Sequence, residues 1–94
     1  MRKYVIERTV PGAGGMTSEQ LAELAGASND VLRGLGTDIQ WIESHVVDDK
    51  IYCLYAATSE EELVLEHARL GGFPADSVRR VEATIDPTTA ELIQ

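Results

Sequence analysis

The sequence IQWIESHVVDDKIYCLYAA, residues 39–57, decides the fold of this chain. The two arms of this stretch are rich in the β-prone residues Val, Ile, Tyr and Trp, and the acidic pair Asp48-Asp49 separates them. Such a pattern predicts two β-strands, 39–47 and 50–57, joined as an antiparallel hairpin. The hairpin lies at mid-chain, with one amphipathic segment and one short apolar run on each side of it.

The N-terminal side predicts a strand followed by a helix. YVIER opens a strand near 3–10, which ends where PGAGG, residues 11–15, removes an amide donor and adds flexible positions. No Gly-Lys-Ser/Thr follows this cluster, so it is interpreted as a loop rather than a phosphate cradle. Thr17 and Gln20 have capping-box spacing, and apolar residues then recur with helical period, which predicts a helix over 18–35.

The C-terminal side repeats that order. Thr58 and Ser59 offer a helix cap, the acids at 60–62 complement the positive end of the helix dipole, and GGFP at 71–74 is a stop signal. We therefore expect a second helix over 59–71. Alternating apolar residues then predict a last strand over 77–86, after which Asp86-Pro87 turns the chain into a short tail.

These elements predict an α+β fold: a single ferredoxin-like βαββαβ domain, residues 1–94, with a four-stranded antiparallel sheet and two helices on one face. The other face of the sheet is then uncovered. A chain of 94 residues buries only a little over ~60% of its unfolded surface, so help from a partner is expected. We expect a homodimer formed across the open sheet face.

Composition excludes several classes of protein. A net charge of -8 repels a phosphate backbone, so nucleic acid is not an expected ligand. No apolar run approaches the ~18 residues of a membrane span, and the N-terminus has no signal-peptide pattern, which predicts a cytoplasmic protein. A lone cysteine, Cys53, excludes an internal disulfide. A metal site would therefore use histidines and carboxylates, with at most one thiolate.

The hairpin register decides which side chains meet on each face. A two-residue loop at Asp48-Asp49 places His45 opposite Tyr52, whereas a three-residue loop places Cys53 opposite His45. The shorter loop is preferred because it puts fewer charges under the helices. It assigns to the helix side Ile42, Ser44, Val46, Ile51, Cys53 and Tyr55. It assigns to the open face Trp41, Glu43, His45 and Tyr52, joined by Glu7 and Glu82 from the outer strands.

Three residues can be interpreted in two ways. His45 is either a metal ligand or proton shuttle, helped by Glu43 and Glu7 on its face, or an ordinary interface histidine. His67 is either a ligand or acid/base group, or a residue that stabilises the end of its helix. Cys53 is either a nucleophile or a buried structural thiol. No Ser-His-Asp order, HExxH or Walker pattern names a reaction.

Several segments together resemble a family of small bacterial domains of unknown function that has a nickel-binding member. They are YVIER with PGAGG, WIESHVVDDKIYC, EHARLGGFP and IDPTT, in that order, over nearly the whole chain. The resemblance implies a ferredoxin-like dimer that binds nickel, without an established reaction. It contributes Glu7, Cys53 and His67 as candidate ligands, whereas Glu43 and His45 come from the strand argument above.

The favoured hypothesis is a cytoplasmic nickel-binding protein that uses imidazole nitrogen and carboxylate oxygen and needs no organic cofactor. One alternative is a dimeric α+β barrel enzyme, monooxygenase- or isomerase-like, with His45, His67, Tyr55 and Cys53 as acid/base groups. That alternative requires a deep apolar cavity reached by one of these side chains. Another is a purely structural or interaction module, which predicts neither a cavity nor a metal.

Overall fold

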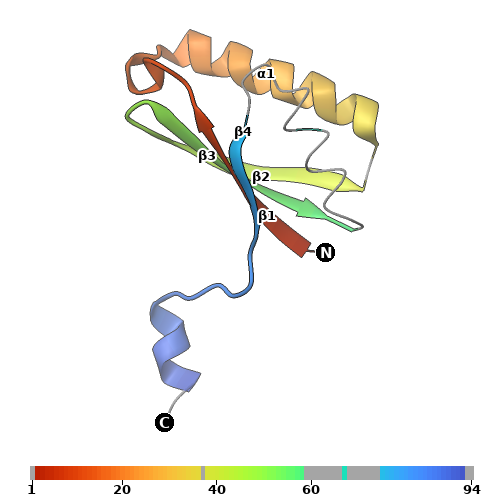
Figure 1. The fold of residues 1–94 in the computed structure, drawn as a ribbon, viewed down its shortest axis with the longest axis vertical. Helices are drawn as coiled ribbons and strands as arrows, with labels where there is room; N and C mark the ends of the chain where they lie inside the picture. The colour runs from red at the N-terminus through yellow and green to blue at the C-terminus, as the bar shows by residue number, and fades with distance from the viewer. Residues whose placement is uncertain (1, 37, 59–66, 68–74, 93–94) are drawn as a thin grey trace.

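The computed structural model describes residues 2–36, 38–58, 67 and 75–92, which form an antiparallel sheet with a helix against one face (Figure 1). The strands are β1 (Arg2–Thr9), β2 (Ile39–Val47), β3 (Lys50–Ala57) and β4 (Ala75–Arg80), and the helices are α1 (Ser18–Leu35) and the short 3₁₀ turns η1 (Ala13–Gly15) and η2 (Pro87–Leu92). The strand order is β2-β3-β1-β4. The predicted pairing of the first strand with 50–57 is therefore confirmed. The second helix expected over 59–71 lies, apart from His67, outside the described residues.

Helix α1 begins at the predicted capping box. The Thr17 side chain accepts a hydrogen bond from the Gln20 amide, and the Gln20 side chain accepts one from the Thr17 amide. Two amides that would otherwise lack a helical partner are satisfied in this way. At the other end Gly36 has a φ of 87°, a conformation open to glycine, which ends the helix where the sequence predicted.

The hairpin has the predicted two-residue loop, with Val47 opposite Lys50. Asp48 takes a left-handed φ of 53°, which aspartate tolerates better than most residues. The Gly-rich loop at 11–15 holds this corner. The Gly14 amide donates to the Asp48 carbonyl at 2.7 Å, and the Gly12 amide donates to Asp49 Oδ1 at 3.0 Å. These two loop amides therefore donate to the hairpin.

Substitution of Gly14 by alanine is expected to lower the free energy of unfolding by about 1 kcal/mol. A Cβ there would lie 3.1 Å from the Asp48 carbonyl oxygen, so the loop or the hairpin must shift. Gly15→Ala is the matched control, because its Cβ meets nothing within 4 Å. Urea unfolding of both variants tests this contact. Equal midpoints for the two variants would contradict it.

A β-bulge in β2 corrects one prediction about the faces of the sheet. Trp41 pairs with Tyr55 and Glu43 pairs with Leu54, so Ile42 is the extra residue. Strict alternation fails at a bulge, because two residues oppose one. Trp41 consequently lies on the helix side, where its Nε1 donates to Ser44 Oγ at 2.9 Å, and its predicted place on the open face was wrong. Ile42, predicted under the helices, is 45% exposed.

Strand β4 is shorter than the predicted 77–86. Its register places Arg80 opposite Tyr4, and the Val81 amide donates to the Lys3 carbonyl as the ladder ends. Because β1 itself begins at Arg2, residues beyond 82 have no β1 residue to pair with. The chain instead leaves the sheet, as Figure 1 shows, and Ile85 is 80% exposed. Glu82, expected on the open face, lies beyond the strand.

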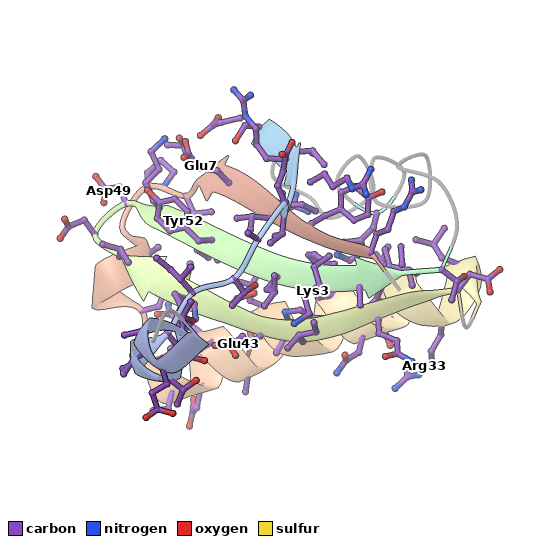
Figure 2. All side chains as sticks on the ribbon, turned by 90° about the horizontal axis from the view of Figure 1, so that it is seen from below. Lys3, Glu7, Arg33, Glu43, Asp49 and Tyr52 are labelled. Atoms are coloured by element: carbon purple, nitrogen blue, oxygen red, sulfur yellow. The ribbon has the colours of Figure 1, made fainter. Side chains whose placement is uncertain are left out.

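The core lies between the sheet and α1. Its buried side chains alternate along β1 and β3, with Tyr4, Ile6, Cys53 and Tyr55 among them. The opposite sheet face is the open face. Figure 2 looks onto it and shows Lys3, Glu7, Glu43 and Tyr52 there, with α1 behind the strands. No helix in the described part of the chain is long and apolar enough to cross a membrane.

Candidate functional site

Glu43 and His45 form a polar pair on the open face. The two residues are separated by one position on β2, after the bulge, and therefore point to the same side. His45 Nε2 lies 2.6 Å from Glu43 Oε2, and the side chains are 67% and 53% exposed. An imidazole nitrogen and a carboxylate oxygen are thus presented together to solvent, as the sequence predicted for this pair.

Glu7 lies on the same face but has a different partner. His45 pairs with Tyr52, and Tyr52 pairs with Glu7, so these residues make a row across β2, β3 and β1. Neighbouring strands are ~4.8 Å apart, which leaves about 10 Å between the backbones of His45 and Glu7. Lys50 Nζ lies 3.0 Å from Glu7 Oε2 and 3.0 Å from Asp76 Oδ2.

This lysine cluster, Glu7, Lys50 and Asp76, changes the titration of two of its members. The hydrogen bonds that the Lys50 ammonium group donates to Asp76 and Glu7 raise the pKa of Lys50. Hydrogen bonds from Thr9 and then Lys50 lower the pKa of Asp76. Lys50 therefore stays a cation beside Glu7. A metal ion at the Glu7 carboxylate would have to displace or tolerate that ammonium group.

Cys53 and His67 lie on the helix side. Cys53 is 6% exposed, in agreement with a buried structural thiol, and His67 is 1% exposed. His67 Nε2 lies 2.5 Å from the Tyr55 hydroxyl, and the two rings are tilted with centroids 4.6 Å apart. Nδ1 of His67 has no hydrogen-bond partner among the described residues. The sheet therefore separates these two candidates from Glu7, Glu43 and His45.

Burial changes the pKa of both partners in the Tyr55–His67 pair. Loss of water lowers the pKa of His67 to about 4, with the Arg8 cation acting in the same direction. Loss of water also raises the pKa of Tyr55 to about 12, aided by Cys53. Both groups are therefore neutral at pH 7. This arrangement holds a proton between phenol and imidazole without any net charge.

A cavity of about 270 Å³ lies between α1 and the sheet. Cys53 and Tyr55, two of the acid/base groups named in the enzyme alternative, both line this cavity. Arg8 and Trp41 line it too, although the sequence pattern had not singled out Arg8 and had predicted Trp41 on the open face. Arg8 could have been found from its pattern, since it occupies the same alternating phase as Tyr4 and Ile6, where a charge is unusual.

Of the five predicted ligands, the structure brings together only Glu43 and His45. Among residues 2–36, 38–58, 67 and 75–92, no three His, Cys, Asp or Glu side chains converge closely enough to hold a metal ion. The pair supplies one nitrogen and one oxygen donor. Its chemistry fits nickel, which accepts imidazole and carboxylate, but more ligands are needed to complete a coordination sphere.

Comparison with known proteins gives one family and one solved structure. Residues 4–81 match the family model described as "Nickel responsive protein SCO4226-like". The fold resembles the crystal structure of SCO4226 from Streptomyces coelicolor A3(2), with a TM-score of 0.66 and 22% sequence identity. The likeness covers 88% of this chain and 99% of that chain. The curated proteins contain no significant match.

Proposed function

The chain belongs to the SCO4226-like family of nickel responsive proteins, and from that premise we propose that it binds nickel through His45 Nε2 and the Glu43 carboxylate. The observation that carries the proposal is the 2.6 Å contact between these two groups on an exposed sheet face. A metal ion would bind to both of these atoms in place of their direct contact. The role is binding, without catalysis.

The donor types favour nickel over the hard cations. Imidazole suits first-row transition metals, and affinity for such sites rises from manganese through nickel to copper. Calcium and magnesium prefer oxygen ligands alone and gain little from His45. The net charge of -8 raises the local concentration of every cation, but it does not distinguish nickel from calcium.

A second copy of the chain would complete the site. One chain offers a single nitrogen-oxygen pair, so we propose a homodimer across the open face, which brings a second Glu43–His45 pair to the same interface. Apolar surface for this contact comes from Val5 and Leu54, both partly buried, beside Tyr52. Glu7 of each chain is a further carboxylate on that face.

The same proposal includes a ferredoxin-like βαββαβ fold, with its second helix over 59–71, and a cytoplasmic location. A reducing compartment suits the one free thiol, Cys53, which is buried beneath α1.

His45→Ala is expected to weaken nickel binding at least tenfold, because it removes the nitrogen donor. Isothermal titration of tag-free protein with nickel, and separately with calcium, measures the change. His67→Gln is the control, since this second histidine lies on the other side of the sheet and its loss should leave nickel affinity unchanged. Binding that survives His45→Ala, or that calcium matches, would show that the acidic surface attracts the ion and would remove the nickel assignment.

The dimer is tested by sedimentation at micromolar concentration, with and without nickel. We expect twice the 10.2 kDa chain mass and one high-affinity nickel ion per dimer. A monomer under both conditions would refute the shared site, and so would one nickel ion bound by each chain.

A further inference from the structure

The described chain ends in an arm, residues 81–92, that projects from the body of the fold. After β4 the chain runs without regular structure to η2, on the side of the open face and away from α1, as Figure 1 and Figure 2 show. Residues 82–88 are all exposed, and Ile85 is 80% exposed. Its own chain therefore leaves this apolar side chain in water.

The outer part of the arm is ordered by its own hydrogen bonds. The Thr88 amide donates to Asp86 Oδ1 at 2.8 Å, and the Thr89 amide donates to the Asp86 carbonyl at 2.9 Å. The Asp86 amide in turn donates to Thr89 Oγ1 at 2.9 Å. A segment that is already ordered loses less conformational entropy when it docks on another surface.

The arm is acidic and long enough to reach a second chain. Residues 83–92 include Asp86 and Glu91 and no Lys or Arg. Six residues of extended chain span up to about 20 Å, whereas two sheets packed face to face are about 10 Å apart. The arm can therefore cross an interface between two sheets. All of it except its first residue lies outside residues 4–81, which the family model matches.

The open face carries the opposite charge at one corner, where β1 begins and β4 ends. Lys3 lies on this face (Figure 2), and Arg79 joins it because it pairs with Val5. Neither basic side chain makes an ion pair with another residue in the part of the chain that the structure describes. Val5 also pairs with Leu54, so the basic corner adjoins the apolar middle of the face. An acidic segment with an apolar side chain complements this surface.

We propose that the arm of each chain crosses to the second copy and docks on its open face. Ile85 packs beside the partner's Val5 and the partner's Leu54, and the acids of the arm face the partner's Lys3 and the partner's Arg79. A two-fold dimer repeats every contact, so both arms dock in the same way. The inference rests on the homodimer of the proposed function and adds to it the segment that holds the two chains together.

Ile85→Asp is expected to raise the dissociation constant of the dimer about tenfold or more, because a charge replaces an apolar contact in each of the two arms. Thr84→Asp is the matched control, since it adds the same charge to the adjacent exposed position without removing a large apolar side chain. Sedimentation over a range of concentrations measures both. A monomeric parent would overturn the dimer and the exchange together. A dimeric parent whose dissociation constant is unaffected by Ile85→Asp would overturn the exchange alone.

Two complementary charge variants test whether the arm docks on the other chain or on its own. Lys3→Glu with Arg79→Glu reverses the basic corner, and Ala90→Lys with Glu91→Lys reverses the arm. Each variant should dimerise about tenfold more weakly than the parent, because like charges then meet in both contacts. An equimolar mixture should recover the parent affinity, since each arm then meets a corner of opposite charge on the other chain. A mixture that associates no more tightly than the two variants alone, with both folded by circular dichroism, would overturn the exchange.

Discussion

Lowering the pH from 6.5 to 4 is expected to remove about 3 kcal/mol of stability through His67 alone. Its pKa is about 4 in the folded protein, against an ordinary value of 6.5. The unfolded chain therefore binds a proton in this interval that the folded chain does not, and stability rises with pH. The contribution is fully present above pH 6.5 and is lost progressively toward pH 4. Below pH 4 the folded protein must also accept a charge in a site that is 1% exposed.

Urea unfolding at a series of pH values, with His67→Gln compared to the parent protein, isolates this effect from that of the carboxylates. Glutamine cannot take up the proton, so the variant should be less stable at pH 7 but should lose less stability as the pH falls. The two curves should approach each other near pH 4. Curves that stay parallel from pH 7 to pH 4 would mean that His67 is already solvated or charged in the folded state.

The substitution Tyr55→Phe is expected to cost about 2 kcal/mol. The hydroxyl lies 2.5 Å from His67 Nε2, and Nδ1 of the same ring already has no partner among the described residues. Its loss would leave Nε2 of a ring that is 1% exposed without this hydrogen bond. The free-energy penalty for leaving a buried polar group unsatisfied is larger than the net stabilisation that one hydrogen bond provides. Removal of a single oxygen atom therefore has a large effect on stability.

Tyr52→Phe is the matched control. Tyr52 lies on the same strand as Tyr55, but it is only partly buried and is on the open face of the sheet. It should change the unfolding free energy by less than about 0.5 kcal/mol. Thermal unfolding of both variants makes the comparison. If the two substitutions have equal effects, the Tyr55–His67 bond does not contribute to stability as proposed.

These experiments treat the two histidines as different groups, and the sequence did not separate them. Both were candidate metal ligands, because each offers an imidazole side chain. The structure places His45 in solvent beside Glu43, where it is available to a metal ion, and His67 in the core beside Tyr55. The side of the sheet on which each histidine lies is set by strand pairing and by packing, which are contacts between distant parts of the chain.

The features that the sequence determined by itself are local. The capping box at Thr17 and Gln20 fixed the start of α1, because the hydrogen bonds join residues three positions apart. The two-residue loop at Asp48-Asp49 fixed the hairpin register and so placed His45 opposite Tyr52. Period-two alternation after the bulge then placed Glu43 and His45 on one face, which is why this pair could be predicted.

The tertiary structure alone decided the remainder. The bulge at Ile42 moved Trp41 to the helix side, since an extra residue in one strand is defined only by its pairing with the other. The end of β4 followed from where β1 begins. Arg8 became a cavity residue because the sheet buries its side chain under α1, although its sequence neighbours gave only a hint. In each case the deciding contact joins residues far apart in the chain, and no local pattern of residues records it.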